Sequence, residues 1–62
     1  MSTFKIYVKY SVVIEEEVFD VDAESEFDAL NKAFEKEEYI LEDLHKKHGE
    51  SVEFEEFVAV KK

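Results

Sequence analysis

Several residue types on which small proteins often depend are absent or rare in this chain of 62 residues. There is no cysteine, which excludes disulfide bonds and zinc sites built on thiolates. There is no arginine, the side chain that most often reads phosphate and guanine through paired hydrogen bonds. The single glycine leaves no glycine-rich loop whose backbone N–H groups would bind a phosphate. The absences therefore point away from disulfide frameworks and from phosphate recognition.

Long apolar segments are also missing. No run of apolar residues approaches the ~18 residues of a membrane-spanning helix, and the first residues do not resemble a signal peptide. We therefore expect a cytoplasmic protein without a membrane partner. The chain has 17 acidic residues against 8 lysines and a net charge of -9, which repels nucleic acids and anionic lipids. Direct binding to nucleic acid is not expected.

The residues that are present indicate a folded domain. Hydrophobic residues make up 45% of the chain and include six phenylalanines and three tyrosines, which bury large areas. A chain of 62 residues lies near the lower limit for independent folding. We therefore predict one domain, residues 1–62, whose core depends on good packing or on self-association.

Alternating apolar and charged residues predict three strands. The first is TFKIYVKY, residues 3–10, and the second ends with VFDVDA, residues 18–23. The chain must reverse between Ser11 and Glu16, although this segment contains no glycine, proline or asparagine. The third strand is SVEFEEFVAVKK, residues 51–62, where Glu56 interrupts the inner row and indicates a β-bulge. The predicted inner row of this last strand consists of Val52, Phe54, Val58 and Val60.

A helix is predicted between the second and third strands. Ser25 precedes an apolar-periodic run and has Asp28 three residues later, which is an N-cap pattern. Apolar residues follow at helical spacing, and Gly49 stands where a left-handed residue often ends a helix. We therefore predict one helix from Glu26 to His48. Glu37 falls in its apolar stripe, which predicts a distortion there.

Charge predicts the order of the strands. The outer face of the first strand carries lysines, whereas the outer faces of the second and third strands carry carboxylates. Opposite charges across from each other stabilise a sheet and like charges destabilise it, so the lysine strand is expected in the middle. The predicted fold is α+β with element order β-β-α-β, a three-stranded antiparallel sheet of order 2-1-3, and one long helix on one face. The charged residues used here are Lys5, Lys9, Asp20, Asp22, Glu53 and Glu55.

Two groups of carboxylates form the candidate partner-binding surface. One lies in the hairpin between the first two strands, and the other follows one flank of the predicted helix. Such a surface steers a protein towards a basic partner. The alternative is a solubilising surface with ion pairs between helical neighbours, such as Asp28 with Lys32. The candidate partner-binding residues are Glu15, Glu16, Glu17, Asp28, Glu35, Glu38 and Glu42.

No pattern in the sequence predicts catalysis, a cofactor or a metal site. His45 and His48 are three residues apart, with Glu42 before them, a spacing that some metal-binding helices use. Histidines at this end also complement the helix dipole without any metal. The acidic run Glu15–Glu17 lacks the converging ligands of a calcium loop, and there is no Ser-His-Asp or Cys-His arrangement. We therefore predict a protein that is not an enzyme.

The outer face of the sheet offers a second kind of surface. If the predicted face assignments hold, Tyr7, Val18 and Phe57 form an apolar patch among the charges of that face. An exposed patch on a small domain often marks an interface. Burial in a homodimer would extend a small core, and packing between strands of one chain is the alternative.

Two stretches, FKIYVKY and VFDVDAESEFDALNKAFE, resemble the small DpnD/PcfM-like proteins. Those proteins carry a V-x-V-x-A-x-S-x-x-x-A transition from strand to helix, and the resemblance covers about residues 4–36. It implies a β-β-α core and a mobile-element protein, an accessory of restriction loci, plasmids or phages without a known catalytic role. No functional residue is carried over from it. The transition falls here on Phe19, Val21, Ala23, Ser25 and Ala29.

We therefore expect a small, non-enzymatic acidic interaction protein. It would be a phage- or plasmid-type accessory or inhibitor that docks electrostatically on the basic surface of a nucleic-acid-binding protein, with DNA mimicry as one mode of docking. The alternative is a structural homodimer that uses the outer face of the sheet and has no charge-specific partner.

Overall fold

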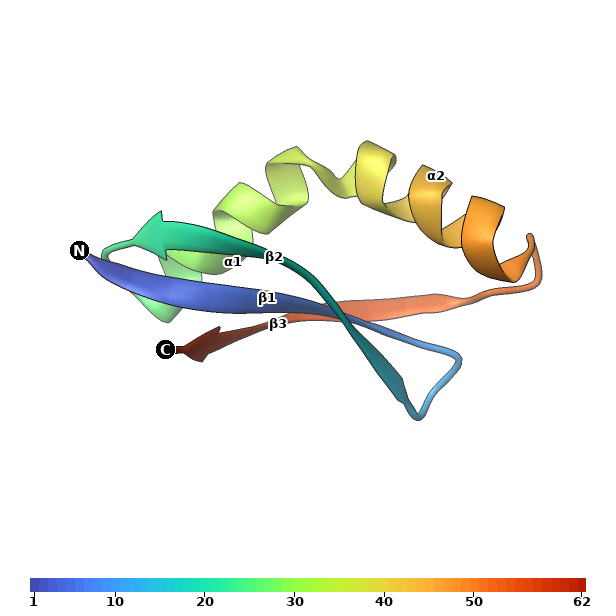
Figure 1. The fold of residues 1–62 in the computed structure, drawn as a ribbon, viewed down its shortest axis with the longest axis horizontal. Helices are drawn as coiled ribbons and strands as arrows, with labels where there is room; N and C mark the ends of the chain where they lie inside the picture. The colour runs from blue at the N-terminus through green and yellow to red at the C-terminus, as the bar shows by residue number, and fades with distance from the viewer.

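The structure is a computed structural model that describes all 62 residues of the chain. A three-stranded sheet in the order β2-β1-β3 carries two helices on one face (Figure 1). The α+β class, the antiparallel pairing and the strand order agree with the prediction. The elements in chain order are β1 (Ser2–Tyr10), β2 (Ile14–Ala23), α1 (Glu26–Glu35), α2 (Glu37–His48) and β3 (Phe54–Lys61).

The lysine-bearing strand β1 lies in the middle of the sheet. Lys5 lies opposite Asp20 of β2, and Lys9 lies opposite Glu15 of β2 and Glu56 of β3. Both neighbours therefore present carboxylates to this strand. Opposite charges therefore lie across from each other. The strand order was predicted from this pairing.

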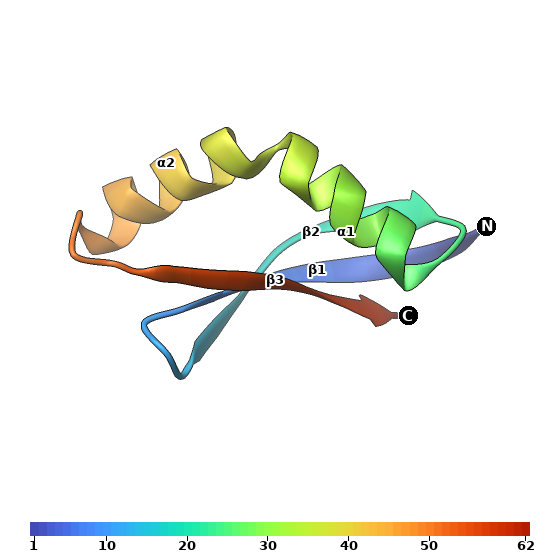
Figure 2. The same ribbon diagram turned by 180° about the vertical axis from the view of Figure 1, so that it is seen from behind.

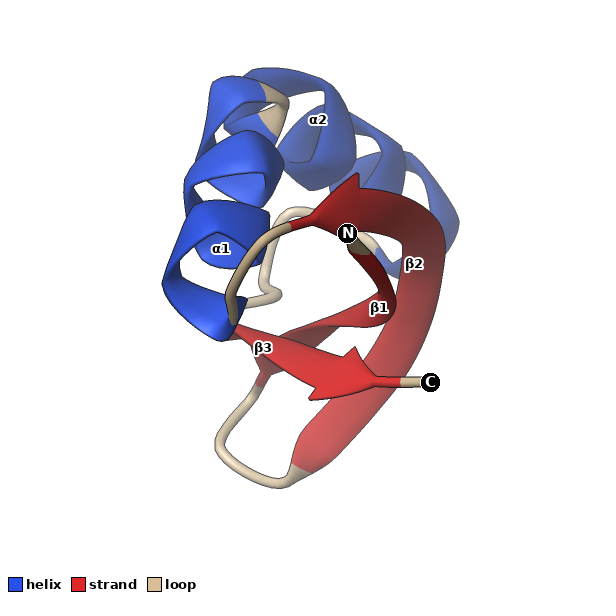
Figure 3. Ribbon diagram, turned by 90° about the vertical axis from the view of Figure 1, so that its left-hand side faces the viewer, coloured by secondary structure: helices blue, strands red, loops and turns tan.

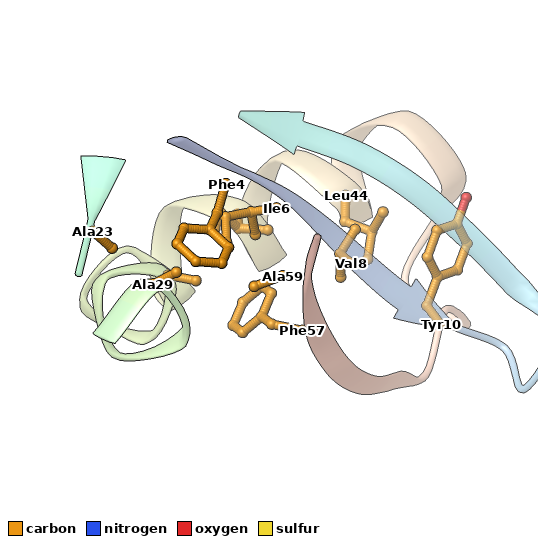
Figure 4. Close-up of a cluster of buried hydrophobic side chains, with 11 residues drawn as sticks. Phe4, Ile6, Val8, Tyr10, Ala23, Ala29, Leu44, Phe57 and Ala59 are labelled. Carbon is orange, nitrogen blue, oxygen red and sulfur yellow. The ribbon is translucent and has the colours of Figure 1, made fainter. Parts of the chain in front are cut away.

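The hydrophobic core lies between the sheet and the helices (Figure 4). Its centre is β1, where Ile6 and Val8 are 0% and 1% exposed. Small residues of α1, Ala29 and Ala33, allow that helix to approach the sheet closely. The complete set of buried residues is Phe4, Ile6, Val8, Tyr10, Ala23, Ala29, Ala33, Ile40, Leu44, Phe57 and Ala59.

The helical segment consists of two helices, so the prediction of one long helix is wrong. The break falls at Lys36, whose φ and ψ are -108° and 13° and whose N–H donates to the carbonyl of Ala33 at 3.0 Å. A continuous helix would place Glu37 in the apolar stripe. The break instead lets α2 begin in a new phase that buries Ile40 and Leu44 and leaves Glu37 half-buried.

The ends of the helical segment follow the predicted capping pattern. The N–H of Asp28 donates to Oγ of Ser25 at 3.1 Å, and the N–H of Glu24 donates to the carboxylate of Asp28 at 3.4 Å. Gly49 has φ +94° and its N–H donates to the carbonyl of His45 at 2.8 Å. A positive φ of this kind is readily adopted only by glycine, so the single glycine ends α2 as expected.

A β-bulge occurs in β3 where the sequence indicates one. Tyr10 pairs with Phe54 but Lys9 pairs with Glu56, so Glu55 is the extra residue. This residue shifts the alternation of side chains between the two faces. After it, Phe57 and Ala59 are the residues of β3 that face the helices. The predicted inner row, which continued through Val58 and Val60, is therefore wrong in its second half.

A second bulge, without a signal in the sequence, occurs in β2. Ile6 pairs with Phe19 whereas Tyr7 pairs with Glu17, which leaves Val18 as the extra residue. Bulges increase the local twist of a strand. Beyond this point the hairpin formed by β1 and β2 turns away from α2 (Figure 1).

The reversal between β1 and β2 is a tight turn over Ser11–Val13. Both Ser11 and Val12 have positive φ, 49° and 71°, and the N–H of Val13 donates to the carbonyl of Ser11 at 2.8 Å. This hydrogen bond defines a γ-turn centred on Val12. A positive φ is strained for a β-branched residue, so this turn forms despite its sequence.

Candidate functional site

Four carboxylates form a row on the outer face of the sheet along β2, which we call the acidic row. Each lies opposite an outer-face residue of β1, and all four residues are exposed. Glu17 and Asp20 lie on the same face, although they are three residues apart, because the bulge at Val18 shifts the alternation between them. The acidic row consists of Glu15, Glu17, Asp20 and Asp22.

Lysines hold the middle of the acidic row in place. Nζ of Lys5 lies 2.7 Å from Oε1 of Glu17 and 3.8 Å from Oδ1 of Asp20. Nζ of Lys62 lies 2.9 Å from Oδ2 of Asp20. The hydrogen bond from Lys62, together with the charges of both lysines, lowers the pKa of Asp20, and the hydrogen bond with Glu17 raises the pKa of Lys5. Four carboxylates therefore share two bonded lysines, and the row keeps a negative excess.

The ends of the acidic row have no ion pair. Glu15 lies opposite Lys9 in the register, but no ion pair joins them. Asp22 accepts a hydrogen bond of 2.7 Å from the hydroxyl of Thr3, which leaves its charge unbalanced. The alternation in the sequence predicts that Asp20 and Asp22 lie on the outer face of the sheet. It does not identify either residue as partner-binding. The bulge that joins both residues to Glu15 and Glu17 is invisible in the sequence.

Glu16 lies on the opposite face from its two neighbours. It pairs with Val8 of the inner face, and its Oε2 lies 3.3 Å from Nε2 of His48. The ring of His48 stacks on Tyr10 at a centroid distance of 5.5 Å. Burial raises the pKa of the Tyr10 hydroxyl, and the carboxylate of Glu16 raises it further. The predicted hairpin surface Glu15–Glu17 is thus divided, because Glu16 helps to hold the end of α2 against the sheet.

The predicted ridge along the helix is also divided. Two of its members lie on α1 and two on α2, because the helix is broken at Lys36. Oδ2 of Asp28 lies 3.7 Å from Nζ of Lys32, and Oε1 of Glu42 lies 3.4 Å from Nζ of Lys46. Glu35 and Glu38, on either side of the break, are exposed and form no ion pair. The ridge therefore offers two unbalanced carboxylates instead of one continuous line of four.

A small cleft lies beside the acidic row, between β2 and α2. Its volume is about 70 Å³, well below the ~300 Å³ at which pockets for small-molecule ligands begin. The cleft is large enough for the end of one aliphatic side chain, and half of its lining is apolar. The residues that line it are Val8, Glu16, Glu17, Val18, Ile40, Asp43, Leu44 and Lys47.

The structure contradicts the predicted apolar patch on the outer face of the sheet. Phe57 is only 4% exposed and belongs to the core, where its ring contacts those of Phe34 and Phe54. Val18, at the bulge, packs against the same core. The bulge in β3 explains the difference for Phe57. Tyr7 keeps its place on the outer face and lies opposite Val58.

The histidines are not arranged as a metal site. No three histidine, aspartate or glutamate side chains come together in a manner that would hold a metal ion. His48 contacts Tyr10 and Glu16 as described, and no contact joins it to His45. The contacts of His48 are therefore a ring stacking with Tyr10 and a polar contact with one carboxylate, that of Glu16.

Comparisons with known protein families, with curated proteins and with solved structures give no match. Neither helix has the length and apolar character needed to cross a membrane.

Proposed function

We propose that this protein is a non-enzymatic interaction protein that docks electrostatically on the basic surface of a nucleic-acid-binding protein. The acidic row is the observation that carries this proposal. It places four exposed carboxylates along one strand, with only two lysines, Lys5 and Lys62, in ion pairs with them. A surface of this kind attracts lysine- and arginine-rich surfaces over several ångströms and raises the rate of association.

Mimicry of nucleic-acid charge is the mode of action that follows from this surface. A nucleic-acid-binding protein presents positive side chains to a regular line of phosphates. A rigid line of carboxylates on a sheet competes for the same side chains. The protein would therefore act as an accessory or inhibitor that occupies a basic surface in place of nucleic acid.

Affinity capture from a cell lysate tests this proposal. Immobilised protein should retain basic nucleic-acid-binding proteins at low salt and release them as ionic strength approaches ~1 M, where the screening length falls to ~3 Å. Short duplex DNA should also displace them, since it competes for the same surface. Retention that is insensitive both to salt and to duplex DNA would exclude the proposal.

Two double variants with equal charge change locate the contact. Glu15→Gln with Asp22→Asn neutralises the unpaired ends of the acidic row, and Glu35→Gln with Glu38→Gln neutralises the unpaired residues at the helix break. We expect the first pair to weaken retention more than the second pair. The reverse result would assign the contact to the helices, where the predicted ridge lies.

Self-association through the outer face of the sheet is a second candidate function. Tyr7 and Val58 lie opposite each other on that face, and Val60, next to them, is 48% exposed. This apolar strip replaces the predicted patch that included Phe57. A contact between two copies would bring two acidic rows close together, so salt should strengthen it by screening their repulsion.

Sedimentation analysis at increasing salt distinguishes the two candidates. Docking on a basic partner weakens as salt rises, whereas a homodimer through this face becomes more populated. A chain that stays monomeric at high concentration and high salt removes the second candidate. The variant Val58→Lys, which places a charge in the strip, is the corresponding control.

A further inference from the structure

We infer that the basic partner binds as an added β-strand along the free edge of β2, through a segment in which basic and apolar residues alternate. This inference rests on the proposed function and specifies its partner. It combines three observations: unpaired backbone groups along β2, the acidic row on the outer face of that edge, and the cleft beside the row, between β2 and α2.

The hydrogen bonds of β1 show which way its backbone groups point. The N–H of Ser11, the residue directly after β1, donates to the carbonyl of Glu53 at 2.8 Å, and the carbonyl of Thr3, within β1, accepts from the N–H of Lys62 at 2.9 Å. The odd-numbered residues of β1 therefore bond to the β3 side. Alternate residues of a central strand bond to opposite neighbours, so the even-numbered residues of β1 bond to β2.

The same alternation identifies the free groups of β2. The residues of β2 that lie opposite the even-numbered residues of β1 are Ile14, Glu16, Phe19 and Val21. These residues direct their N–H and C=O groups to β1, and the four residues of the acidic row direct theirs to the free edge. One contact supports this assignment: Nζ of Lys32 donates to the carbonyl of Asp22 at 2.6 Å. The backbone groups of Glu15, Glu17 and Asp20 remain available to an incoming strand.

The edge selects a basic strand because its free backbone groups at Glu15, Glu17 and Asp20 belong to acidic residues. The side chains of a strand bonded to this edge would lie beside Glu15, Glu17 and Asp20, where lysine or arginine is stabilised and carboxylates are repelled. A second copy of β2 is unsuitable for this reason, since antiparallel self-pairing would place acidic residues opposite acidic residues. The occupant is therefore a partner segment with basic residues at every second position.

The cleft selects what lies between those basic residues. Side chains alternate between the faces of a strand, so the intervening residues of the partner point to the helix-covered side. There they meet the cleft between β2 and α2, which Val18, Ile40 and Leu44 line with apolar surface. A volume of about 70 Å³ accommodates one aliphatic side-chain end. Strand addition of this kind draws affinity from backbone hydrogen bonds and specificity from alternate side chains.

Synthetic peptides test the inference directly. The first probe is a peptide of alternating lysine and valine, and the second has the same composition with all lysines grouped at one end. Two further peptides keep the alternating sequence but carry backbone N-methyl groups, one on every lysine and the other on every valine. Only one of these methylated sets removes the N–H groups that face β2. We expect that set to lose roughly tenfold or more in affinity and the other set to bind as the unmodified peptide does.

Amide hydrogen exchange provides a readout that electrostatic contact alone would not change. The amides of Glu15, Glu17 and Asp20 should exchange freely in the unbound protein and become protected when the alternating peptide binds. The variant Glu15→Pro removes one of these N–H groups without removing a bond to β1, and proline is tolerated at such edge positions. Glu15→Gln is its matched control, because it removes the same charge and keeps the N–H.

The outcomes separate this inference from the proposed function. Protection of the edge amides, with weaker binding for Glu15→Pro than for Glu15→Gln, supports strand addition. Equal binding of alternating, grouped and both methylated peptides, without amide protection, would overturn strand addition and leave electrostatic docking in place. Absence of binding by every basic peptide at low salt would overturn both, and the exchange experiment on the native chain gives this answer even if the proline variant does not fold.

Discussion

The two outer strands of the sheet, β2 and β3, occupy equivalent places in the fold but have different surroundings. In β3, Phe57 and Ala59 are 4% and 7% exposed, and α1 lies beside this strand (Figures 2 and 3). The ring of Phe34, on α1, packs against that of Phe57 at 5.1 Å. In β2 the residues that face outward are exposed carboxylates. The helix-facing side of β3 is therefore packed closely against α1, whereas the outward side of β2 carries carboxylates and its helix-facing residues Val18, Phe19 and Val21 are only partly buried.

The charges on β2 address a problem that all sheet edges share. An exposed sheet edge is a template for unwanted pairing, and proteins protect it by covering it or by placing charges on it. The packing of Phe57 against α1 contributes to the core of this small chain. Charging β2 keeps identical copies apart and leaves its backbone groups accessible to a strand of opposite charge. The β3 side thus contributes packing to the core, and the β2 side is the one for which we propose an interaction.

The largest loss of stability is expected when the packing of β3 against α1 is disrupted. Phe57→Ala removes a buried ring that contacts Phe34 and Phe54, and such truncations cost about 3–5 kcal/mol. A small domain has roughly 5 kcal/mol or little more of total stability. We expect this variant to be largely unfolded by circular dichroism. Val60→Ala, at a residue that is 48% exposed on the same strand, is the control and should stay folded. A folded Phe57→Ala chain would show that β3 does not anchor the core.

Reversing the charges of β1 should replace the attraction between its lysines and the carboxylates of the neighbouring strands with repulsion. The double variant Lys5→Glu with Lys9→Glu places carboxylates opposite carboxylates along β2 and Glu56. We expect a lower melting temperature, with a larger decrease at low salt than at high salt because salt screens the repulsion. Lys46→Glu, on an exposed pair of α2, should cause a smaller decrease. Equal melting temperatures for the double variant and the native chain would contradict the charge argument for the strand order.

The stability of the fold should depend on pH through Asp20, Tyr10 and Lys5. The pKa of Asp20 is lowered from 3.8, so its contribution is present above that pH and is lost as the pH falls through the lower value of the folded state. The pKa values of Tyr10 and Lys5 are raised from 10.0 and 10.5, so their contributions are present below pH 10.0 and are lost as the pH rises through the higher folded values.

Variants assign each limb of this pH profile. Asp20→Asn should flatten the acid limb of a urea-unfolding series, and Tyr10→Phe should flatten part of the alkaline limb. Thr3→Val removes a different contact of the outer face, its hydrogen bond to Asp22, and serves as the control. An acid limb that is unchanged in Asp20→Asn would mean that the lysine contacts of Asp20 are not stabilising.

The smallest change in stability is expected at the turn between β1 and β2. Val12 has φ 71°, and Val12→Gly should relieve backbone strain and stabilise the fold by about 1 kcal/mol. Val13→Gly is the matched control, because Val13 is also an exposed valine of this turn but has no positive φ. It should be neutral or destabilising in urea unfolding. A loss of stability in Val12→Gly would show that the valine side chain makes a favourable contact at the tip.

Local patterns were sufficient to predict much of the fold. Period-two alternation predicts the strands, the Ser25 cap and Gly49 mark the ends of the helical segment, and the lysines of β1 predict the strand order. These features depend on residues that are near each other in the chain or on charges that must be paired. The two-helix arrangement was only partly visible, as an acidic residue at Glu37 in an apolar stripe.

The candidate site was less predictable because it depends on register. The face on which a side chain lies follows from counting by twos along a strand, and one inserted residue reverses the count for all residues beyond it. The bulge at Glu55 moved Phe57 from the outer face to the core, and the bulge at Val18 joined Glu17 to Asp20. The sequence contained the carboxylates, but their alignment in one row required the register.

By itself, the sequence determined an acidic, aromatic-rich chain with three strands, a helical segment and a central lysine strand, because periodicity and charge act locally. Only the tertiary structure decided that Phe57 of β3 packs against α1 and that the carboxylates of β2 align on the outward face. Both outcomes depend on the bulges at Val18 and Glu55, which set the register, and on the packing of α1 against the sheet through Ala29 and Ala33. No local pattern encodes such long-range packing, which emerges when the helices and the curved sheet bury their apolar surfaces together.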